Sequence, residues 1–527
     1  MKPKNMQIAF LKTRVLLAVM LAVAALAATA HAAAPGITGP TFNLTAQPAY
    51  LSQPDGQSIY SWGYGCNGAP SGYAPAAISG ASCSTMQVPG PTLIVTEGQT
   101  VTVTLTNGLP TSAGNTSILF PGFQVSTSGG SLGLLTQEAI PGGTVTYSFV
   151  AATPGTHSYY SGTQGDLQVE MGLYGAIIVL PSSVPKACTM GLAASNLAAE
   201  AHWGEKDFRL ADAAYDHAKT CYDREYLFQF SEIDPRIHSQ AQAQVSALGN
   251  CTAGAAGCSL QVSTEPYRPA YFMINGRSMP DDMDPNYSYQ YPHQPYNGNP
   301  HLHPGEIVLL RIIGQGRWQH PFHEHANHVR ILARDGNLIL SQSDPTLLAG
   351  PALFTTTTTP GVAMDGLFYY TGRGLNWDMY GHKPTSTDAT AKLPCTPDAE
   401  GYNTSDPTAI NYYEWCQDHN KPLQAAPFGD VANGGPVTLP DSNILTNGAW
   451  YGGSPYLGPD ATVRATGPSG VTPPAGTIAN SPGGEAGFAF MWHSHNEREI
   501  TTNNAFPGGM MMMMLVDSRE FVIDESN

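Results

Sequence analysis

Short runs of β-branched and aromatic residues, separated by turns rich in glycine, proline and asparagine, recur along most of the chain. Residues 92–95, 101–105 and 145–150 are three such runs, and their composition is typical of strands. Many short strands at this spacing predict a β-sandwich, so we expect residues 33–182 to form one β domain. A second series of such runs predicts further β structure over residues 225–527. The chain would then have two β domains in all or three, and we favour two.

Two stretches depart from this pattern. Residues 183–224, between the expected β domains, contain alanine-rich segments at 193–201 and 210–214. Alanine favours helix, so we expect a helical connector there. Residues 381–484 are rich in proline, glycine, asparagine and aspartate. That composition is typical of an elaborated insertion or of a loop that wraps over the surface.

Residues 1–32 predict a secretory signal peptide. Lysine and arginine residues precede an apolar, alanine-rich run at 15–30, and Ala30-His31-Ala32 fits the small-x-small cleavage pattern. No second long apolar run follows, so we expect no membrane span. The mature protein would then be exported to the periplasm, the cell surface or the extracellular medium.

Charge and cysteine content narrow the class of protein further. The formal net charge is −17 at pH 7, and a chain without a basic patch does not suit nucleic acid or an anionic membrane surface. Eight cysteines in an exported chain indicate disulfides. The sequence does not prove their connectivity, but pairing of nearest neighbours gives Cys66–Cys83, Cys188–Cys221, Cys251–Cys258 and Cys395–Cys416.

Two pairs of histidines stand two positions apart, each pair after an apolar run. One pair is His323 and His325, and the other is His493 and His495. Alternate residues of a strand share a face, so two neighbouring strands would direct four imidazoles at one point. Four imidazoles suit Cu(II), Zn(II) or Ni(II), with copper highest in the affinity order. The alternative is a hydrogen-bonded histidine cluster at a domain interface.

Two further patterns carry weaker signals. His301 and His303 form a third pair before a Pro-Gly turn, where we expect a solvated loop rather than a metal site. Residues 510–514 are five consecutive methionines. Thioethers are soft ligands for Cu(I), but methionine also fills irregular cores, so we expect a buried core strand there.

The histidine pairs are part of longer motifs. The order His320-Pro-x-His323-x-His325, followed much later by Trp-His493-x-His495, resembles the C-terminal copper motifs of the multicopper oxidases, the laccase-like cupredoxin family. Similarity extends to residues 90–98, 172–179, 274–277 and 305–311. The resemblance implies an all-β fold of tandem cupredoxin-like Greek-key β-sandwiches. It also implies a type 1 copper held by His, Cys and His, and a trinuclear copper cluster held by four His-x-His pairs.

Half of the cluster ligands and two of the three type 1 ligands are missing from the chain. The resemblance makes His320 a type 1 ligand and the two histidine pairs half of the cluster. However, Ser494 stands at the position of the type 1 cysteine and Glu499 at that of the second type 1 histidine. A serine hydroxyl cannot replace the soft thiolate. Residues 33–201 contain one histidine, His157, whereas two His-x-His pairs are needed there.

We therefore expect an exported multicopper-oxidase-like protein that binds a single copper or zinc ion and lacks blue-copper oxidase turnover. The expected ligands are His323, His325, His493 and His495, with His320 as a nearby fifth ligand or hydrogen-bond donor. One alternative is an oxidoreductase with a mononuclear or rebuilt copper site. The other is a metal-free envelope or matrix protein whose insertion mediates interactions. The sequence leaves open whether the protein is an enzyme and what small molecule it would act on.

Overall fold

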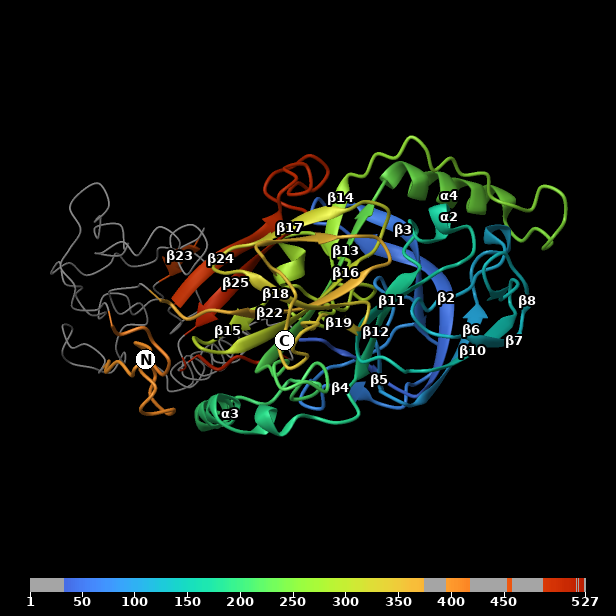
Figure 1. Cartoon of the computed structure of the whole chain (residues 1–527). Coiled ribbons are helices and arrows are strands. Elements are labelled where there is room, and N and C mark those ends of the chain that lie inside the picture. Colours follow the sequence, from blue (N-terminus) through green and yellow to red (C-terminus); the bar gives the residue numbers. More distant parts are fainter. Residues whose placement is uncertain are drawn as a thin grey trace, which may run out of the picture.

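The computed structural model describes residues 33–373, 395–417, 453–456 and 487–525, except 518 and 520. The expected signal peptide, and most of the expected insertion at 381–484, lie outside these residues. Within the described chain most regular structure is strand, in four large sheets and one small hairpin (Figure 1).

Two five-stranded sheets form the first sandwich. One has the order β11-β12-β5-β1-β4 and the other the order β3-β2-β6-β10-β7. The strands of the first sheet are β1 (Gly36–Thr38), β4 (Tyr73–Ala74), β5 (Leu93–Thr96), β11 (Gly155–Tyr160) and β12 (Tyr174–Leu180). Those of the second are β2 (Thr41–Ser52), β3 (Ser58–Cys66), β6 (Thr100–Asn107), β7 (Ser126–Gly129) and β10 (Thr144–Val150). The hairpin consists of β8 (Ser131–Leu132) and β9 (Gln137–Glu138).

Strict alternation along β6 and β10 explains how these residues form a sandwich. Val101, Val103 and Leu105 are buried while the threonines between them are not. Val145 and Tyr147 follow the same period of two and enter the same core. Strands that neighbour each other in the sheets are often not consecutive in the chain, as in Greek-key sandwiches.

The second sandwich contains the candidate site. One sheet has the order β14-β13-β16-β22-β18-β19, with β20 pairing β18, and the other the order β15-β25-β24-β17-β21, with β23 pairing β24. The first sheet consists of β13 (Arg224–Ile233), β14 (Tyr271–Ile274), β16 (Ile307–Gly314), β18 (Val329–Arg334), β19 (Asn337–Leu338), β20 (Ala352–Leu353) and β22 (Ala363–Tyr369). The second consists of β15 (His301–Leu302), β17 (His320–Glu324), β21 (Thr355–Thr358), β23 (Gly453–Tyr456), β24 (Gly487–Ser494) and β25 (Met511–Asp517).

Large side chains fill the core of this second sandwich. Phe228, Phe322, Trp492 and Met512 are members of one buried cluster. Burying each such side chain contributes about 1.5–3 kcal/mol, so this core fixes which face of β17, β24 and β25 turns inward. The expected all-β class with tandem sandwiches is confirmed.

Helices are few in the described chain. They are the α-helices α2 (Gly165–Gln168), α3 (Leu192–Trp203) and α4 (Pro235–Leu248), and the 3₁₀ helices η1 (Thr111–Ala113), η2 (Lys186–Thr189) and η3 (Asp281–Met283). Helix α3 forms where the first alanine-rich segment predicts it. None of these helices is long and apolar enough to cross a membrane.

The second alanine-rich segment, residues 210–214, forms no helix, so that prediction is wrong. Its backbone instead makes a bridge from Ala213 to Cys221, and the adjacent Tyr215 donates a 2.5 Å hydrogen bond to the buried Asp365. Tertiary contacts thus override a weak local propensity. Helix α4 was not expected, although Asp234 caps it by accepting from the Arg236 N–H and Pro235 is its first residue.

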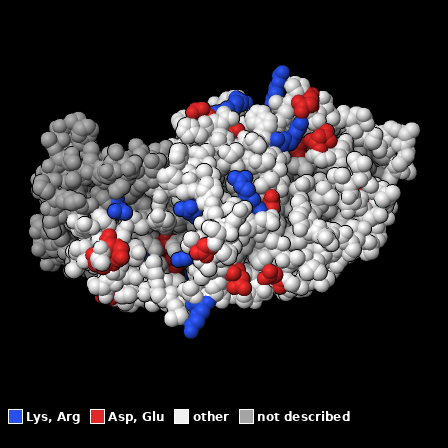
Figure 2. All heavy atoms as spheres, viewed as in Figure 1, with Lys and Arg blue, Asp and Glu red and all other residues white. Residues whose placement is uncertain are grey.

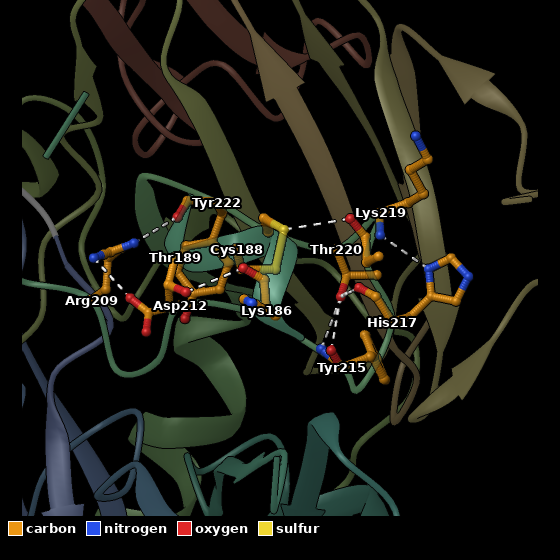
Figure 3. Close-up of a disulfide and its surroundings, with 12 residues drawn as sticks. Lys186, Cys188, Thr189, Arg209, Asp212, Tyr215, His217, Lys219, Thr220 and Tyr222 are labelled. Atoms are coloured by element: carbon orange, nitrogen blue, oxygen red, sulfur yellow. Dashed lines mark hydrogen bonds and ion pairs between the residues drawn. A yellow bond between two sulfur atoms is a disulfide. The ribbon is translucent and has the colours of Figure 1, made fainter. Parts of the chain in front are cut away.

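All four disulfides join the cysteines that lie nearest in sequence, as expected, and no described cysteine is free. The Cys188–Cys221 bond ties η2 to the loop before β13 (Figure 3). In that loop Thr220 donates to the carbonyl oxygens of Tyr215 and His217, and the Lys219 N–H donates to the His217 ring. The disulfide and these turns hold the connector against the second sandwich.

Buried polar contacts join the two sandwiches. Asp365 of β22 accepts hydrogen bonds from the N–H and the hydroxyl of Thr156 in β11, at 3.0 and 2.6 Å. The Tyr174 hydroxyl donates to Ser231 at 2.8 Å. Residues 33–185 contain neither lysine nor arginine, and the end of the molecule built from β6, β7 and β10 is almost free of charged side chains in Figure 2.

Candidate metal centre

Strands β17 and β24 lie side by side in antiparallel register, with His323 directly opposite His493. Because side chains alternate between the two faces of a strand, Phe322 and Trp492 turn into the core. The histidines consequently turn to the opposite face. The apolar positions of both strands therefore determine where the imidazoles lie.

This register brings four imidazole rings together, and we call His323, His325, His493 and His495 the four-histidine cluster. The ring centroid of His323 lies 4.8 Å from that of His325, 5.6 Å from His493 and 5.1 Å from His495. The centroid of His493 lies 5.2 Å from that of His325 and 5.5 Å from His495. The His495 side chain is 56% exposed, so the cluster opens to solvent on that side.

Hydrogen bonds at the back of two rings define which nitrogens face the cluster. Nδ1 of His323 lies 2.9 Å from the Thr355 hydroxyl, and Nδ1 of His493 lies 2.8 Å from the Ser494 carbonyl. Nε2 of His493 lies 3.3 Å from Nε2 of His325. A ring that donates one N–H to a hydroxyl or carbonyl while its other nitrogen remains available is the usual state of a metal-ligating histidine.

Two of the four rings, His323 and His493, are in the protonation state that binds metals. Burial lowers the pKa of His323 to about 4, and the neighbouring rings add to this effect. Burial also lowers the pKa of His493. Both rings are therefore neutral at pH 7, and neutral imidazole is the ligand form.

The spacing of the rings fits a small divalent ion. Imidazoles on one tetrahedral ion, with bonds of about 2.0–2.1 Å, would place their ligating nitrogens about 3.3 Å apart and their ring centres about 5 Å apart. The 3.3 Å nitrogen separation and the centroid distances of 4.8–5.6 Å agree with this geometry. As the described side chains stand, no group of three or more His, Cys, Asp or Glu residues is arranged to hold an ion. Binding therefore requires the rings to turn their nitrogens toward one point.

His320 lies outside the four-histidine cluster. It belongs to the core-facing side of β17, where it is completely buried. Its Nε2 lies 3.0 Å from the Glu232 carboxylate and its Nδ1 lies 2.9 Å from the Glu499 carboxylate. Burial alone would lower the pKa of His320, but the two glutamates outweigh burial and raise it to about 9. His320 is therefore an imidazolium at neutral pH, and neither ring nitrogen has a lone pair for a metal.

Ser494 joins the same buried group. Its hydroxyl donates a 2.5 Å hydrogen bond to Glu499, whose other oxygen accepts from the Asn496 amide at 2.9 Å. His320, Ser494 and Glu499 are the three positions that the resemblance aligns with type 1 copper ligands. The structure brings all three together, but around a protonated histidine.

A family model supports the relationship that these positions suggest. Residues 81–184 match the model of the multicopper oxidases. We call this matched segment the multicopper oxidase domain. An L-ascorbate oxidase of Brassica rapa subsp. pekinensis is 38% identical over 96 residues, which is 18% of this chain and 16% of that protein. The matched segment thus spans only about a sixth of this relative.

Solved structures resemble the chain at lower levels. The blue copper oxidase of Nitrosomonas europaea is 15% identical, with 90% of this chain and 85% of that chain covered and a TM-score of 0.43. The copper nitrite reductase of the same organism is 18% identical, with 63% and 84% covered and a TM-score of 0.37. Scores below 0.5 carry little weight, so the sandwich architecture rests on the sheets themselves.

On the resemblance to multicopper oxidases, the other two copper-binding pairs would lie at residues 119–121 and 160–162 of the multicopper oxidase domain. Leu119 and Tyr160 form an isolated bridge, with the Leu119 N–H donating to Tyr160 at 2.7 Å. The two segments are thus adjacent but contain no histidine. His157 packs against Phe123 with centroids 4.7 Å apart, and burial lowers the pKa of its ring.

His301 in β15 and His303 directly after this strand are both buried, so the expected solvated loop is wrong. Nδ1 of His301 lies 2.5 Å from Asp517, and Nε2 of His303 lies 2.7 Å from Glu205. Arg224 pairs with Glu205 in the same buried group, at 2.5 Å. These contacts come from four segments that are distant in sequence, and they explain why His301 and His303 are buried rather than solvated.

Sequence reasoning also missed the partners of His320. Glu232 lies at the end of β13, and the Tyr267 hydroxyl donates to it at 3.1 Å. Tyr267 also lies 2.6 Å from Glu170 of the multicopper oxidase domain. The one signal in the sequence was Glu232, within the mostly apolar residues 226–233. An unpaired charge is costly in a buried strand, so this residue indicated a buried partner.

Proposed function

We propose that the chain is an exported multicopper-oxidase-like protein that binds one divalent copper or zinc ion through the four-histidine cluster. The observation that carries this proposal is the register of β17 on β24, which gathers the four rings on one face. Four disulfides suit an oxidising compartment and support export. The acidic charge balance does not suit nucleic acid as a partner.

We also propose that the protein lacks blue-copper oxidase turnover. A type 1 site needs a soft thiolate to carry electrons from the substrate, whereas Ser494 offers a hydroxyl that is already bound to Glu499. His320 is held as a cation between two carboxylates. An ion in the four-histidine cluster would supply Lewis acidity or, in the case of copper, one-electron chemistry. His495 would expose it to solvent, and Thr355 would keep the His323 ring in place.

Metal content tests the first part of the proposal. Mature protein incubated with copper or zinc and then desalted should retain one ion per chain by elemental analysis. Free metal at a hundred times the Kd should stabilise the fold by about 2.7 kcal/mol, which thermal melting would detect. The double variant His323→Ala/His495→Ala should lose both effects.

The matched control is His202→Ala/His217→Ala, which removes two histidines that lie outside the cluster. It should retain the ion and the stabilisation. Wild-type protein that stays metal-free, with an unchanged melting temperature, would leave the cluster as a hydrogen-bonded group only. The alternative of a metal-free envelope or matrix protein would then be favoured.

Oxygen consumption tests the second part. Copper-loaded protein should be nearly colourless and should not oxidise phenols or aromatic amines at laccase-like rates. Rapid oxygen-coupled turnover that His493→Ala abolishes would contradict the proposal and would favour an oxidoreductase with a rebuilt copper site.

A further inference from the structure

The five methionines at 510–514 divide between the two faces of their strand. Met510, Met512 and Met514 are completely buried and belong to the core of the second sandwich with Trp492. The expectation of a core strand therefore holds for these three. Because side chains alternate, Met511 and Met513 must turn to the opposite face of the sheet, where the four-histidine cluster lies.

The register of β24 on β25 places the outward methionines beside the cluster. Met511 is directly opposite His493, and Met513 is directly opposite Met491. Residues 491 and 493 are two apart on β24, so all four side chains share the outer face. They form a rectangle of three thioethers and one imidazole, which we call the methionine patch.

The Met511–His493 and Met513–Met491 pairs lack mutual backbone hydrogen bonds. The Ser494 N–H donates to the Met510 carbonyl at 2.9 Å, whereas the Met511 N–H donates to the carbonyl of Gly509, just before β25. The Met513 N–H points to the sulfur of Met283 at 3.4 Å, and not to β24. In antiparallel sheets the pairs without mutual hydrogen bonds have Cα atoms about 4.5 Å apart and the nearest side chains. Both pairs of the patch are of this type.

The patch has the chemistry of a soft-metal site. Thioethers are uncharged, polarisable donors that select Cu(I) over harder divalent ions. Nδ1 of His493 is engaged with the Ser494 carbonyl, so an ion would bind its Nε2 in place of the 3.3 Å contact with Nε2 of His325. His493 and Met511 are only 8% and 5% exposed, which shields the donors from competing water.

We propose that His493, Met491, Met511 and Met513 form a binding site for a monovalent soft cation, Cu(I). This goes beyond the divalent site proposed above and rests on that proposal only for one consequence. Because each site needs the same Nε2 of His493, a divalent ion in the four-histidine cluster and Cu(I) in the methionine patch exclude each other. Cu(I) binding itself does not depend on the divalent site.

The test measures Cu(I) affinity without oxygen, by competition with a chromogenic Cu(I) chelator, and repeats the titration with Ag(I) as a redox-inert soft ion. The variant Met511→Leu/Met513→Leu should lose on the order of tenfold or more in affinity for both ions, which corresponds to about 1.4 kcal/mol or more. Its zinc binding should be unchanged. Leucine is close in volume to methionine, so the fold should tolerate the change.

The matched control is Met512→Leu/Met514→Leu, which removes the same number of thioethers from the core face of the same strand. It should bind Cu(I) and Ag(I) as the wild type does. Equal losses in the two double variants, or no loss in either, would overturn the proposal. Wild-type protein that binds Cu(I) but not zinc would support the methionine patch while refuting the divalent site. The reverse result would refute the methionine patch alone.

Discussion

His320 stands at a position that the resemblance gives to a copper ligand, yet here its protonated ring supplies the positive charge of the site. Glu232 and Glu499 lie 3.0 and 2.9 Å from its two nitrogens. Two carboxylates buried without a counter-charge would be strongly destabilising. Ser494 and Glu499, at the positions that the resemblance gives to a cysteine and a histidine, are therefore consistent with His320, because together they accommodate an imidazolium in place of a metal cation.

The raised pKa of His320 predicts a pH dependence of stability. Its pKa in the folded state is about 9, against 6.5 when unperturbed. A raised pKa means that the folded state binds the proton more tightly. The resulting stabilisation is complete below pH 6.5 and is lost as the pH rises through about 9. Urea unfolding of the wild type should show this decline between pH 6.5 and 9.

The variant Glu499→Gln should remove much of this effect. Breaking a buried ion pair costs about 3–5 kcal/mol, so the variant should be less stable at pH 6 and should show a shallower decline up to pH 9. Glu497→Gln changes a carboxylate that is 83% exposed and should behave as the wild type. Parallel pH profiles for wild type and Glu499→Gln would show that His320 is not charged in the fold.

Single residues differ in how far the sequence reveals them. The histidine pairs were visible because a spacing of two places both rings on one strand face. The partners of His320 were not visible, since Glu232 is 88 positions away. His301 and His303 have the same spacing as the other pairs, but tertiary charges bury them. A spacing of two therefore predicts that two side chains share a strand face, but it does not predict which residues pack against that face.

Elements were predictable where one local signal dominated. Runs of β-branched residues predicted β6 and β10, and an alanine-rich segment predicted α3. Helix α4 was not predicted. Residues 210–214 were wrongly predicted as helix, because the contacts of Tyr215 and the Cys188–Cys221 bond determine the backbone conformation there. The prediction of a buried core strand at β25 did not distinguish the two faces of that strand. Its methionines alternate between the two faces, but a run of one residue type shows no alternation of apolar and polar residues from which the two faces could be told apart.

Disulfide removal tests how firmly the connector is held. In the chain-entropy view, a loop of 33 residues closed by Cys188–Cys221 contributes about 3.7 kcal/mol. The 7-residue separation of Cys251–Cys258 gives about 2.4 kcal/mol. We expect Cys188→Ala/Cys221→Ala to destabilise the protein more than Cys251→Ala/Cys258→Ala in chemical unfolding. The opposite order would mean that the connector is held mainly by its other contacts.

At the scale of the whole molecule, two sandwiches could be predicted because many short strands leave few alternatives. Their mode of joining could not. Asp365, Thr156 and Tyr215 meet from three distant segments, and no local pattern announces such a contact. The same holds for the path from Glu170 through Tyr267 to Glu232, which links the multicopper oxidase domain to His320.

Anomalous diffraction from crystals of the mature protein soaked in zinc tests the central claim most directly, because it locates the ion. Our account predicts one peak at the four-histidine cluster, about 2.0–2.1 Å from the ligating nitrogens, and no peak between His320 and Glu499. A metal peak between His320 and Glu499, or an empty cluster at saturating zinc, would contradict it.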